Sequence, residues 1–177
     1  MNYVEAPYNY YLNTARETSV FLGGGITNCK DWQKELVSKH LSHLVCPFTT
    51  VFNPRRKTFD MNDPNESEIQ IVWEHKYLRL SDVLVFYFSE ETVCPITLFE
   101  LGAALERNLH AESPQQIVVY CEPKYVRNSD VAIQTKLIND LDRNGHKYAR
   151  VHDTYSHFLS DLNMTLYHIA ASKQYTQ

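Results

Sequence analysis

The sequence has no excess of positive charge and no long apolar run. Its 17 lysine and arginine residues are outnumbered by 21 aspartate and glutamate residues, for a formal net charge of −4 at pH 7. Binding to a nucleic-acid polymer depends on neutralising phosphates, so this balance argues against such a partner. No stretch reaches the roughly 18 apolar residues that span a bilayer. The first residues lack the charged-then-apolar pattern of a secretory signal. We therefore expect a cytoplasmic protein with no membrane partner.

Paired cysteines and metal-ligand spacings are also missing. The four cysteines, Cys29, Cys46, Cys94 and Cys121, form no C-x-x-C pair. In a reducing compartment they are expected to be buried thiols. No Cys/His spacing fits a structural zinc site, and the eight histidines show no metal-ligand spacing on one expected helix face. We therefore expect no metal site.

Strand-like and helix-like segments alternate along the chain. With 177 residues, of which 44% are hydrophobic and 21% charged, the chain predicts one globular domain. Strands are expected at 18–25, within 44–54, and at 82–88, 115–122 and 148–153, and helices at 31–43, 67–81, about 93–108, 130–143 and beyond 153. This order predicts an α/β three-layer sandwich with about five parallel strands, doubly wound as in Rossmann-like and flavodoxin-like folds.

The two ends of this scheme carry further expectations. Residues 1–17 are expected to form an N-terminal extension to a single domain at 18–177. The extension is rich in tyrosine, and we expect it to pack on its own domain or on a partner subunit. The pattern Ser67–Gln70 predicts the cap of the second helix. Asp130 is most simply the cap of a later helix.

Ligands of such sheets bind beyond the carboxyl ends of the strands, which directs attention to the loops after Leu22, Phe88 and Cys121. "GGGITN" at 23–28 follows the first expected strand, and its glycines let a ligand approach main-chain N–H groups. Asn28 stands where G-x-G-x-x-G has its last glycine, and no Gly-Lys-Ser/Thr follows. A plain turn and a binding loop both remain open for this segment.

"VCPITLFELG" at 93–102 predicts a helix with Pro95 at its first position and Glu100 near its positive end. The helix dipole there favours the ionised carboxylate. Gly102 costs about 1 kcal/mol relative to alanine in a helix interior. That cost indicates close approach of another backbone or of a ligand. The alternative is that Glu100 merely complements the dipole.

Other charged residues have two interpretations each. Glu74 on the preceding helix is typical of a solvated face, and Asp82 of a junction between helix and strand. Several carboxylates near one pocket would, however, suit glycosidic chemistry. Arg55 and Arg56 are suited to pairing with a phosphate or carboxylate, or they lie in solvent.

Five blocks occur in a fixed order between about Val20 and Leu137: FLGGGITNCKDWQ, VFNPRR, WEHKYLRLSDVLVFYF, ETVCPITLFELGAAL and DVAIQTKL. Together they resemble the nucleoside 2-deoxyribosyltransferase family. The resemblance implies a glycosyltransferase of nucleotide salvage that exchanges the base of 2′-deoxynucleosides. Its partners would be deoxynucleosides and free nucleobases, without a cofactor. It also implies a homo-oligomer with sites near a subunit interface.

The resemblance assigns roles to particular residues. The family's nucleophile, a glutamate in an E-L-G context, matches Glu100, and a second catalytic acid matches Glu74. The implied reaction passes through a covalent deoxyribosyl-glutamate with net retention. Cys94 replaces an acid that contacts the base, and Phe21 replaces a pocket tyrosine. The candidate substrate-binding residues are Phe21, Gly23, Gly24, Gly25, Asn53, Asp82, Cys94, Asp130 and Gln134, and the family borrows the segment matching 129–134 from a neighbouring subunit.

Two alternatives remain. The first is an N-glycoside hydrolase of deoxynucleosides or of deoxynucleoside 5′-monophosphates, in which water replaces the acceptor base and Arg55 or Arg56 would bind the phosphate. The second is a nucleotide-binding module that keeps the pocket without turnover.

Overall fold

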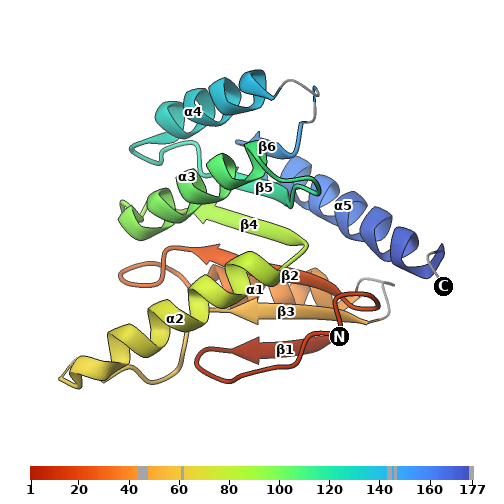
Figure 1. Cartoon of the computed structure of the whole chain (residues 1–177). Coiled ribbons are helices and arrows are strands. Elements are labelled where there is room, and N and C mark those ends of the chain that lie inside the picture. Colours follow the sequence, from red (N-terminus) through yellow and green to blue (C-terminus); the bar gives the residue numbers. More distant parts are fainter. Residues whose placement is uncertain (44–47, 61, 143–144, 146, 176–177) are drawn as a thin grey trace.

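The computed structural model describes residues 1–43, 48–60, 62–142, 145 and 147–175, and these contain one six-stranded sheet (Figure 1). The strands are β1 (Asn2–Glu5), β2 (Thr18–Gly24), β3 (Thr49–Asn53), β4 (Val83–Phe88), β5 (Gln116–Cys121) and β6 (Ala149–His152). They lie in the order β1-β3-β2-β4-β5-β6, and every pairing is parallel. The helices are α1 (Trp32–Lys39), α2 (Pro64–Leu80), α3 (Pro95–Leu109), α4 (Asn128–Leu141) and α5 (Tyr155–Tyr175), with a short 3₁₀ helix at Leu41–His43.

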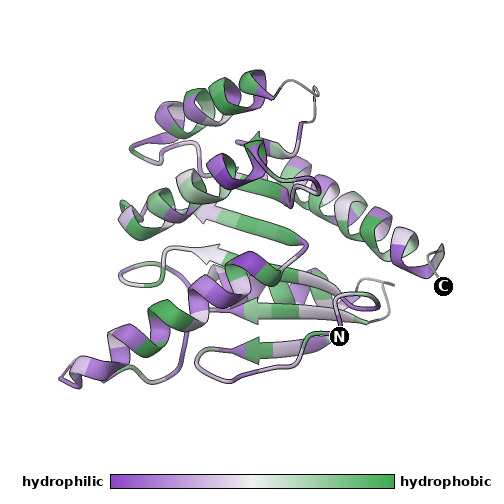
Figure 2. Ribbon diagram, viewed as in Figure 1, coloured by the Kyte–Doolittle hydropathy of each residue, from purple (hydrophilic) through white to green (hydrophobic). Residues whose placement is uncertain are grey.

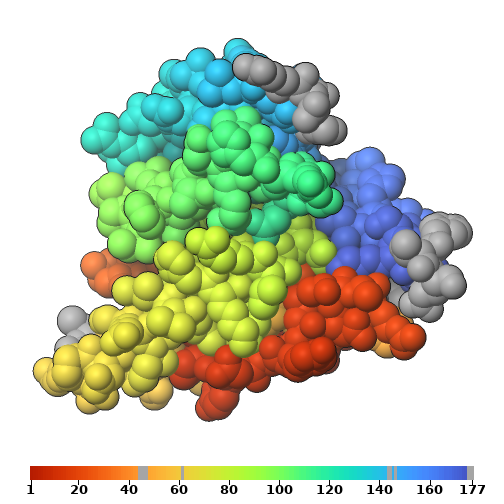
Figure 3. All heavy atoms as spheres, in the orientation of Figure 1, coloured from red at the N-terminus to blue at the C-terminus, as the bar shows by residue number. Residues whose placement is uncertain are grey.

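Helices cover both faces of the sheet, so the predicted three-layer, doubly wound architecture is confirmed. The side chains of α2, α3 and α4 cover the face turned to the viewer in Figure 3, and α1 and α5 lie behind the sheet in Figure 1. All six residues of β4 are buried. Leu84 and Phe86 belong to the core beneath α2 and α3, and Val83 and Val85 to the core beneath α1 and α5. The strands are accordingly mostly hydrophobic in Figure 2, as expected of a parallel sheet buried on both faces.

The sixth strand comes from the tyrosine-rich N-terminal segment. β1 pairs with β3 at the edge of the sheet, with Asn2 opposite Thr50. The indole of Trp73 on α2 donates a 2.8 Å hydrogen bond to the carbonyl oxygen of Tyr8, and the hydroxyl of Tyr77 contacts the backbone of Tyr10. The segment therefore packs on its own domain.

Two predicted helix caps are wrong. α2 begins at Pro64 and not near Ser67, because the Asp63 side chain accepts a hydrogen bond from the amide of Asn65 and proline fits the first position. α4 begins at Asn128, so Asp130 lies inside its first turn. Residues 44–47 of the region expected to contain the second strand, including Cys46, and residue 143 of the expected helix 130–143 lie outside the described residues. The other three cysteines are free thiols, of which Cys94 and Cys121 are buried.

The strands share one direction, so the sheet has an amino edge and a carboxyl edge. Both ends of the described chain lie at the amino edge (Figure 1). The Lys173 ammonium, near the end of α5, bonds there to the carbonyl oxygen of Glu17 and to the carboxylate of Asp82. No described helix is long and apolar enough to cross a membrane.

Candidate active site

The order of the strands creates a crevice at the carboxyl edge. The chain passes from β2 to β3 on one side and then to β4 on the other, so the loops after β2 and β4 diverge, which is where doubly wound folds bind ligands. A cavity of about 640 Å³ lies there, a volume typical of small-molecule sites. Its walls are residues 23–27 after β2, Pro54, Arg56 and Phe59 after β3, Ser67, Gln70, Ile71 and Glu74 of α2, and Thr92, Cys94, Pro95, Ile96, Thr97 and Glu100 at the start of α3.

The glycine loop lies against the strand and loop beside it. A Cβ atom on Gly24 would lie 2.5 Å from Cζ2 of Trp32 and 2.7 Å from the carbonyl oxygen of Tyr87, and one on Gly25 would lie 2.7 Å from Cγ2 of Thr92. Side chains at these positions would collide with neighbouring protein atoms. The glycines are therefore required by close packing, and this packing brings the loop into the cavity wall.

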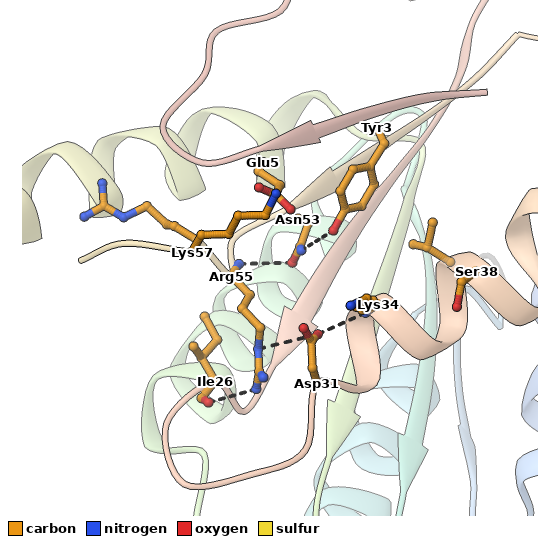
Figure 4. A pocket seen from close by; sticks show the side chains of 11 residues that line it. Tyr3, Glu5, Ile26, Asp31, Lys34, Ser38, Asn53, Arg55 and Lys57 are labelled. Carbon is orange, nitrogen blue, oxygen red and sulfur yellow. Dashed lines mark hydrogen bonds and ion pairs between the residues drawn. The ribbon is translucent and has the colours of Figure 1, made fainter.

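Arg55 holds the same loop from the other side (Figure 4). Its Nη2 atom donates to the carbonyl oxygens of Ile26 at 2.8 Å and Lys30 at 3.1 Å, and its Nε atom lies 3.8 Å from the Asp31 carboxylate. The Lys30 amide donates in turn to the Glu91 carboxylate at 2.7 Å. The guanidinium thus binds carbonyl groups of its own protein, and Arg55 lines a neighbouring cavity instead of this one.

Arg56 is also occupied by protein groups. It forms an ion pair with Glu66, and its guanidinium lies 4.7 Å from the ring centre of Phe59. Its side chain is only 6% exposed, although the residue lines the cavity. Neither arginine is therefore a free phosphate ligand in this structure.

Two carboxyl groups from different helices line the cavity. Glu74 projects from α2, and Glu100 is the sixth residue of α3, after Cys94 as N-cap and Pro95 at the first position. The Gln70 amide, one turn before Glu74, donates to Glu74 Oε1 at 2.7 Å and to the carbonyl oxygen of Pro54 at 2.8 Å. The E-L-G glutamate and the second acid of the sequence pattern are thus brought together.

The protonation of this pair differs from the expectation. Burial, and then the charge of Glu74, raise the pKa of Glu100 to about 8. Burial also raises the pKa of Glu74, opposed by the hydrogen bond from Gln70 and the charge of Arg56. Glu100 lies in the second turn, where the helix dipole has largely faded. At neutral pH Glu100 is therefore mostly protonated, and not the carboxylate that the helix dipole was expected to favour.

Cys94 lies in the cavity wall, and burial raises the pKa of its thiol. A neutral thiol therefore stands where the resemblance suggests a carboxylate. Among the described residues no cluster of histidine, cysteine, aspartate or glutamate suits a metal ion.

Three predicted binding residues lie elsewhere in the structure. Phe21 is fully buried in the core, with its ring centre 6.2 Å from that of Trp73, because strand alternation turns it beneath α2. Asn53 lines a second cavity of about 610 Å³ and donates a 2.6 Å hydrogen bond to the Tyr3 hydroxyl (Figure 4). Asp82 lies at the opposite, amino edge, where it accepts hydrogen bonds of 2.8 Å from Ser19.

Asp130 and Gln134 are exposed on α4 and are not among the described residues that line the cavity of their own chain. Asp130 pairs with Arg127 at 3.2 Å. Gly102 is exposed, a Cβ atom there would meet nothing within 4 Å, and the residue is not among those that line the cavity, so within this chain no backbone approaches it closely.

Sequence reasoning missed Gln70 and Phe59 as cavity residues. The available signal for Gln70 was its place four residues before Glu74, a spacing that puts both side chains on one helix face. For Phe59, in a polar segment with no periodicity, no signal was available.

Comparison with known proteins identifies a family and a shared fold. The family model "Nucleoside 2-deoxyribosyltransferase like" matches residues 17–125, which include the glycine loop, Glu74 and Glu100. The crystal structure of a conserved protein from Enterococcus faecalis V583 superposes with a TM-score of 0.51 at 13% sequence identity. That match covers 86% of this chain and 98% of the other, and it shows a shared fold. No curated protein sequence gives a significant match. The family match spans more than half of the chain, and the chain therefore belongs to the nucleoside 2-deoxyribosyltransferase-like family.

Proposed function

We propose that the cavity binds a 2′-deoxynucleoside and that the protein exchanges its base, with Glu100 as nucleophile and Glu74 as the group that moves the proton. The observation that carries the proposal is the pair of carboxyl groups, which come from two helices, meet in one cavity at the carboxyl edge and are electrostatically coupled. Family membership supports a nucleoside-related ligand.

The single proton of the pair suits both halves of the reaction. When it moves to Glu74, Glu100 becomes the carboxylate that bonds to C1′ of the sugar. The N-glycosidic bond breaks, its electron pair leaves with the base, and the base takes the proton from Glu74. A second base then attacks C1′ from the same face and returns a proton to Glu74, which frees Glu100 and gives net retention. A 2′-deoxyribose forms the oxocarbenium-like transition state more readily, so deoxynucleosides are the expected donors.

Hydrolysis is the second candidate, and Cys94 is the observation that favours it. A neutral thiol in the wall cannot accept the hydrogen bonds that a carboxylate would accept from a base, so the acceptor base is held less tightly. Water then competes for the sugar on Glu100. Because Arg55 and Arg56 are bound to protein groups, nucleosides are favoured over 5′-monophosphates as substrates.

We also propose that a second copy of the chain covers the outer face of α3 and α4. This assembly face carries Ile96, Phe99, Ile133 and Leu137, each more than half exposed. Ile96 also lines the cavity, so a neighbour on this face would reach its mouth and bring polar side chains such as Asp130. The buried free thiols suit a reducing compartment, and we propose that the protein acts in the cytoplasm.

Base exchange tests the function directly. The protein incubated with thymidine and adenine is expected to yield deoxyadenosine, detected by chromatography. Glu100→Gln is expected to lower the rate by at least about 1,000-fold, because the neutral amide is a poor nucleophile. Glu106→Gln is the matched control, since Glu106 is exposed on the same helix. Release of free deoxyribose selects the hydrolase, and binding without any product selects the non-catalytic module.

Mass spectrometry identifies the nucleophile. A 2-fluoro-substituted deoxynucleoside is expected to leave its sugar attached to the peptide that contains Glu100. An adduct on Glu74, or equal labelling of Glu100→Gln and the unaltered protein, would contradict the assignment.

A further inference from the structure

Gln70 makes two hydrogen bonds at the cavity wall, and neither of them caps a helix. It lies in the middle of α2, far from the cap at Asp63, so its side chain does not close the helix end. Its amide nitrogen donates to the carbonyl oxygen of Pro54 at 2.8 Å and to Glu74 Oε1 at 2.7 Å. It thereby joins the end of β3 to one of the two cavity carboxyls.

The orientation of this amide is determined by its neighbours. Both acceptors, a carbonyl and a carboxylate, require the nitrogen and its two protons. Rotating the amide by half a turn would place Oε1 against two oxygen atoms. Oε1 itself is buried, and it has no partner within the described part of the chain. An unpaired buried carbonyl oxygen is unfavourable, so the arrangement indicates that the two donated bonds are the function of this side chain.

The two carboxyl groups of the cavity have different surroundings. Glu74 receives the Gln70 amide and lies in the field of Arg56, which is itself paired with Glu66. The charged group that acts on Glu100 is Glu74, a like charge. Burial disfavours negative charge on both carboxyl groups, but only Glu74 has a hydrogen-bond donor and a cation that partly offset it.

We propose that Gln70 is the positioning residue of the site: it fixes the Glu74 carboxyl in one rotamer and, with Arg56, favours negative charge on Glu74 over Glu100. The proton that Glu100 holds is then the one that the proposed transfer passes through Glu74 to the departing base. Although Gln70 lines the cavity, the role proposed for it acts through Glu74, to which its amide donates.

Direct titration tests the inference without reference to activity. The side-chain ¹³C carboxyl signals of Glu74 and Glu100 are followed against pH in the unaltered protein, assigned with Glu74→Gln and Glu100→Gln. In Gln70→Met the Glu74 signal is expected to titrate at higher pH, because the hydrogen bond to its carboxylate is gone. Gln174→Met, an exposed position on α5, is the matched control. An unchanged Glu74 titration in Gln70→Met overturns the proposal.

The rate arm depends on the proposed base exchange. For Gln70→Met we expect kcat to fall roughly tenfold with KM changed less than about threefold, and the acidic limb of the pH profile to move to higher pH. Gln70→Asn, whose amide is too short for both acceptors, is expected to behave likewise and serves if the methionine variant does not fold. A parallel loss at all pH values, with an unmoved acidic limb, would indicate a purely structural role. If the unaltered protein exchanges no base, the proposed function fails while the titration still decides the role of Gln70.

Discussion

Glu100 is a carboxyl group that the fold holds away from water and beside a second acid. In an unfolded chain a glutamate has a pKa of about 4.3, whereas in the folded protein burial and Glu74 raise the pKa of Glu100 to about 8. Between these two values the folded state holds more protons than the unfolded state. The free energy of unfolding therefore falls as pH rises from about 4 to about 8. The catalytic arrangement thus lowers the stability of the protein at neutral pH.

Replacing this acid should remove that dependence. At pH 8 the free energy of unfolding of Glu100→Gln is expected to exceed that of the unaltered protein by roughly 1–3 kcal/mol, so the variant unfolds at a higher urea concentration. Near pH 4 the two free energies are expected to match. Urea denaturation between pH 4 and pH 8 measures the difference, with Glu106→Gln as the control on the same helix. A difference that stays constant with pH would show that the carboxyl of Glu100 is not held in its neutral form.

Residues of the site were predictable where a local sequence pattern marked them, whereas the directions of their side chains were not. The E-L-G context and the proline before it pointed to Glu100 and to the start of α3, both of which the structure brings to the cavity. Phe21 was misplaced because the face toward which a strand residue points depends on register, which is set by pairing with β3 and β4. The reason for Gly102 could not be read from the sequence either, because a need for glycine can only be judged against the atoms around it, and within this chain a Cβ atom there would meet none.

At the scale of elements, the loop after β2 is clamped between Arg55 on one side and two glutamates on the other. From the side of β3, Arg55 donates hydrogen bonds to carbonyl oxygens of the loop. From the side of β4 and β5, Glu91 accepts from the Lys30 amide and Glu122 pairs with the Lys30 ammonium. A loop held in this way presents a fixed wall to the cavity. At Ile26 its geometry depends on Arg55, since no other described side chain bonds to that carbonyl, whereas the Gly25 carbonyl also accepts from the Trp32 indole.

Loss of the Arg55 contacts should weaken substrate binding more than it slows the chemical step. In Arg55→Met we expect the amides of residues 25–30 to exchange with deuterium faster and the KM for the donor nucleoside to rise about tenfold, because ordering the loop then costs binding energy. Hydrogen-exchange mass spectrometry and steady-state kinetics measure the two effects. Lys57→Met, at an exposed neighbouring position, is the control. Unaltered exchange in this loop would contradict the clamp.

The alternation of strands and helices was predictable from the sequence, because the strands are short apolar runs and the helices repeat apolar residues every three or four positions. β1 was not, since only Val4 of its four residues is buried and its partner lies 48 positions along the chain at Thr50 and beyond. The start of α2 was placed late because Asp63 and Pro64 fit a loop as well as a helix N-terminus.

At the scale of the whole molecule, the three-layer architecture leaves the outer face of α3 and α4 without a covering layer. Phe99 is 68% exposed there and Ile133 57% exposed, on two helices that pack against each other. An apolar face of this kind on two neighbouring helices is typical of an interface. The doubly wound architecture was predicted from the sequence. The exposed apolar face was not, because it depends on which sides of the helices pack against the sheet.

Charge on the assembly face should separate the subunits. Phe99→Glu is expected to sediment as a monomer where the unaltered protein sediments as an oligomer, because a carboxylate would be buried without a partner. Its base-exchange activity is expected to fall at the same time, since Asp130 of a neighbour no longer reaches the cavity. Tyr167→Glu is the control, on α5 across the sheet and 65% exposed. A monomeric unaltered protein would contradict the assembly.

The amino edge of the sheet, where the first strand begins and the last helix ends, is a suitable place to attach labels. An affinity tag, dye or linker joined at either end projects from the side opposite the cavity. The protein can therefore be tethered to a sensor surface through either end with its cavity facing the solution. Dyes at both ends would sit on one side of the molecule, so energy transfer between them would report unfolding and remain insensitive to an occupied cavity.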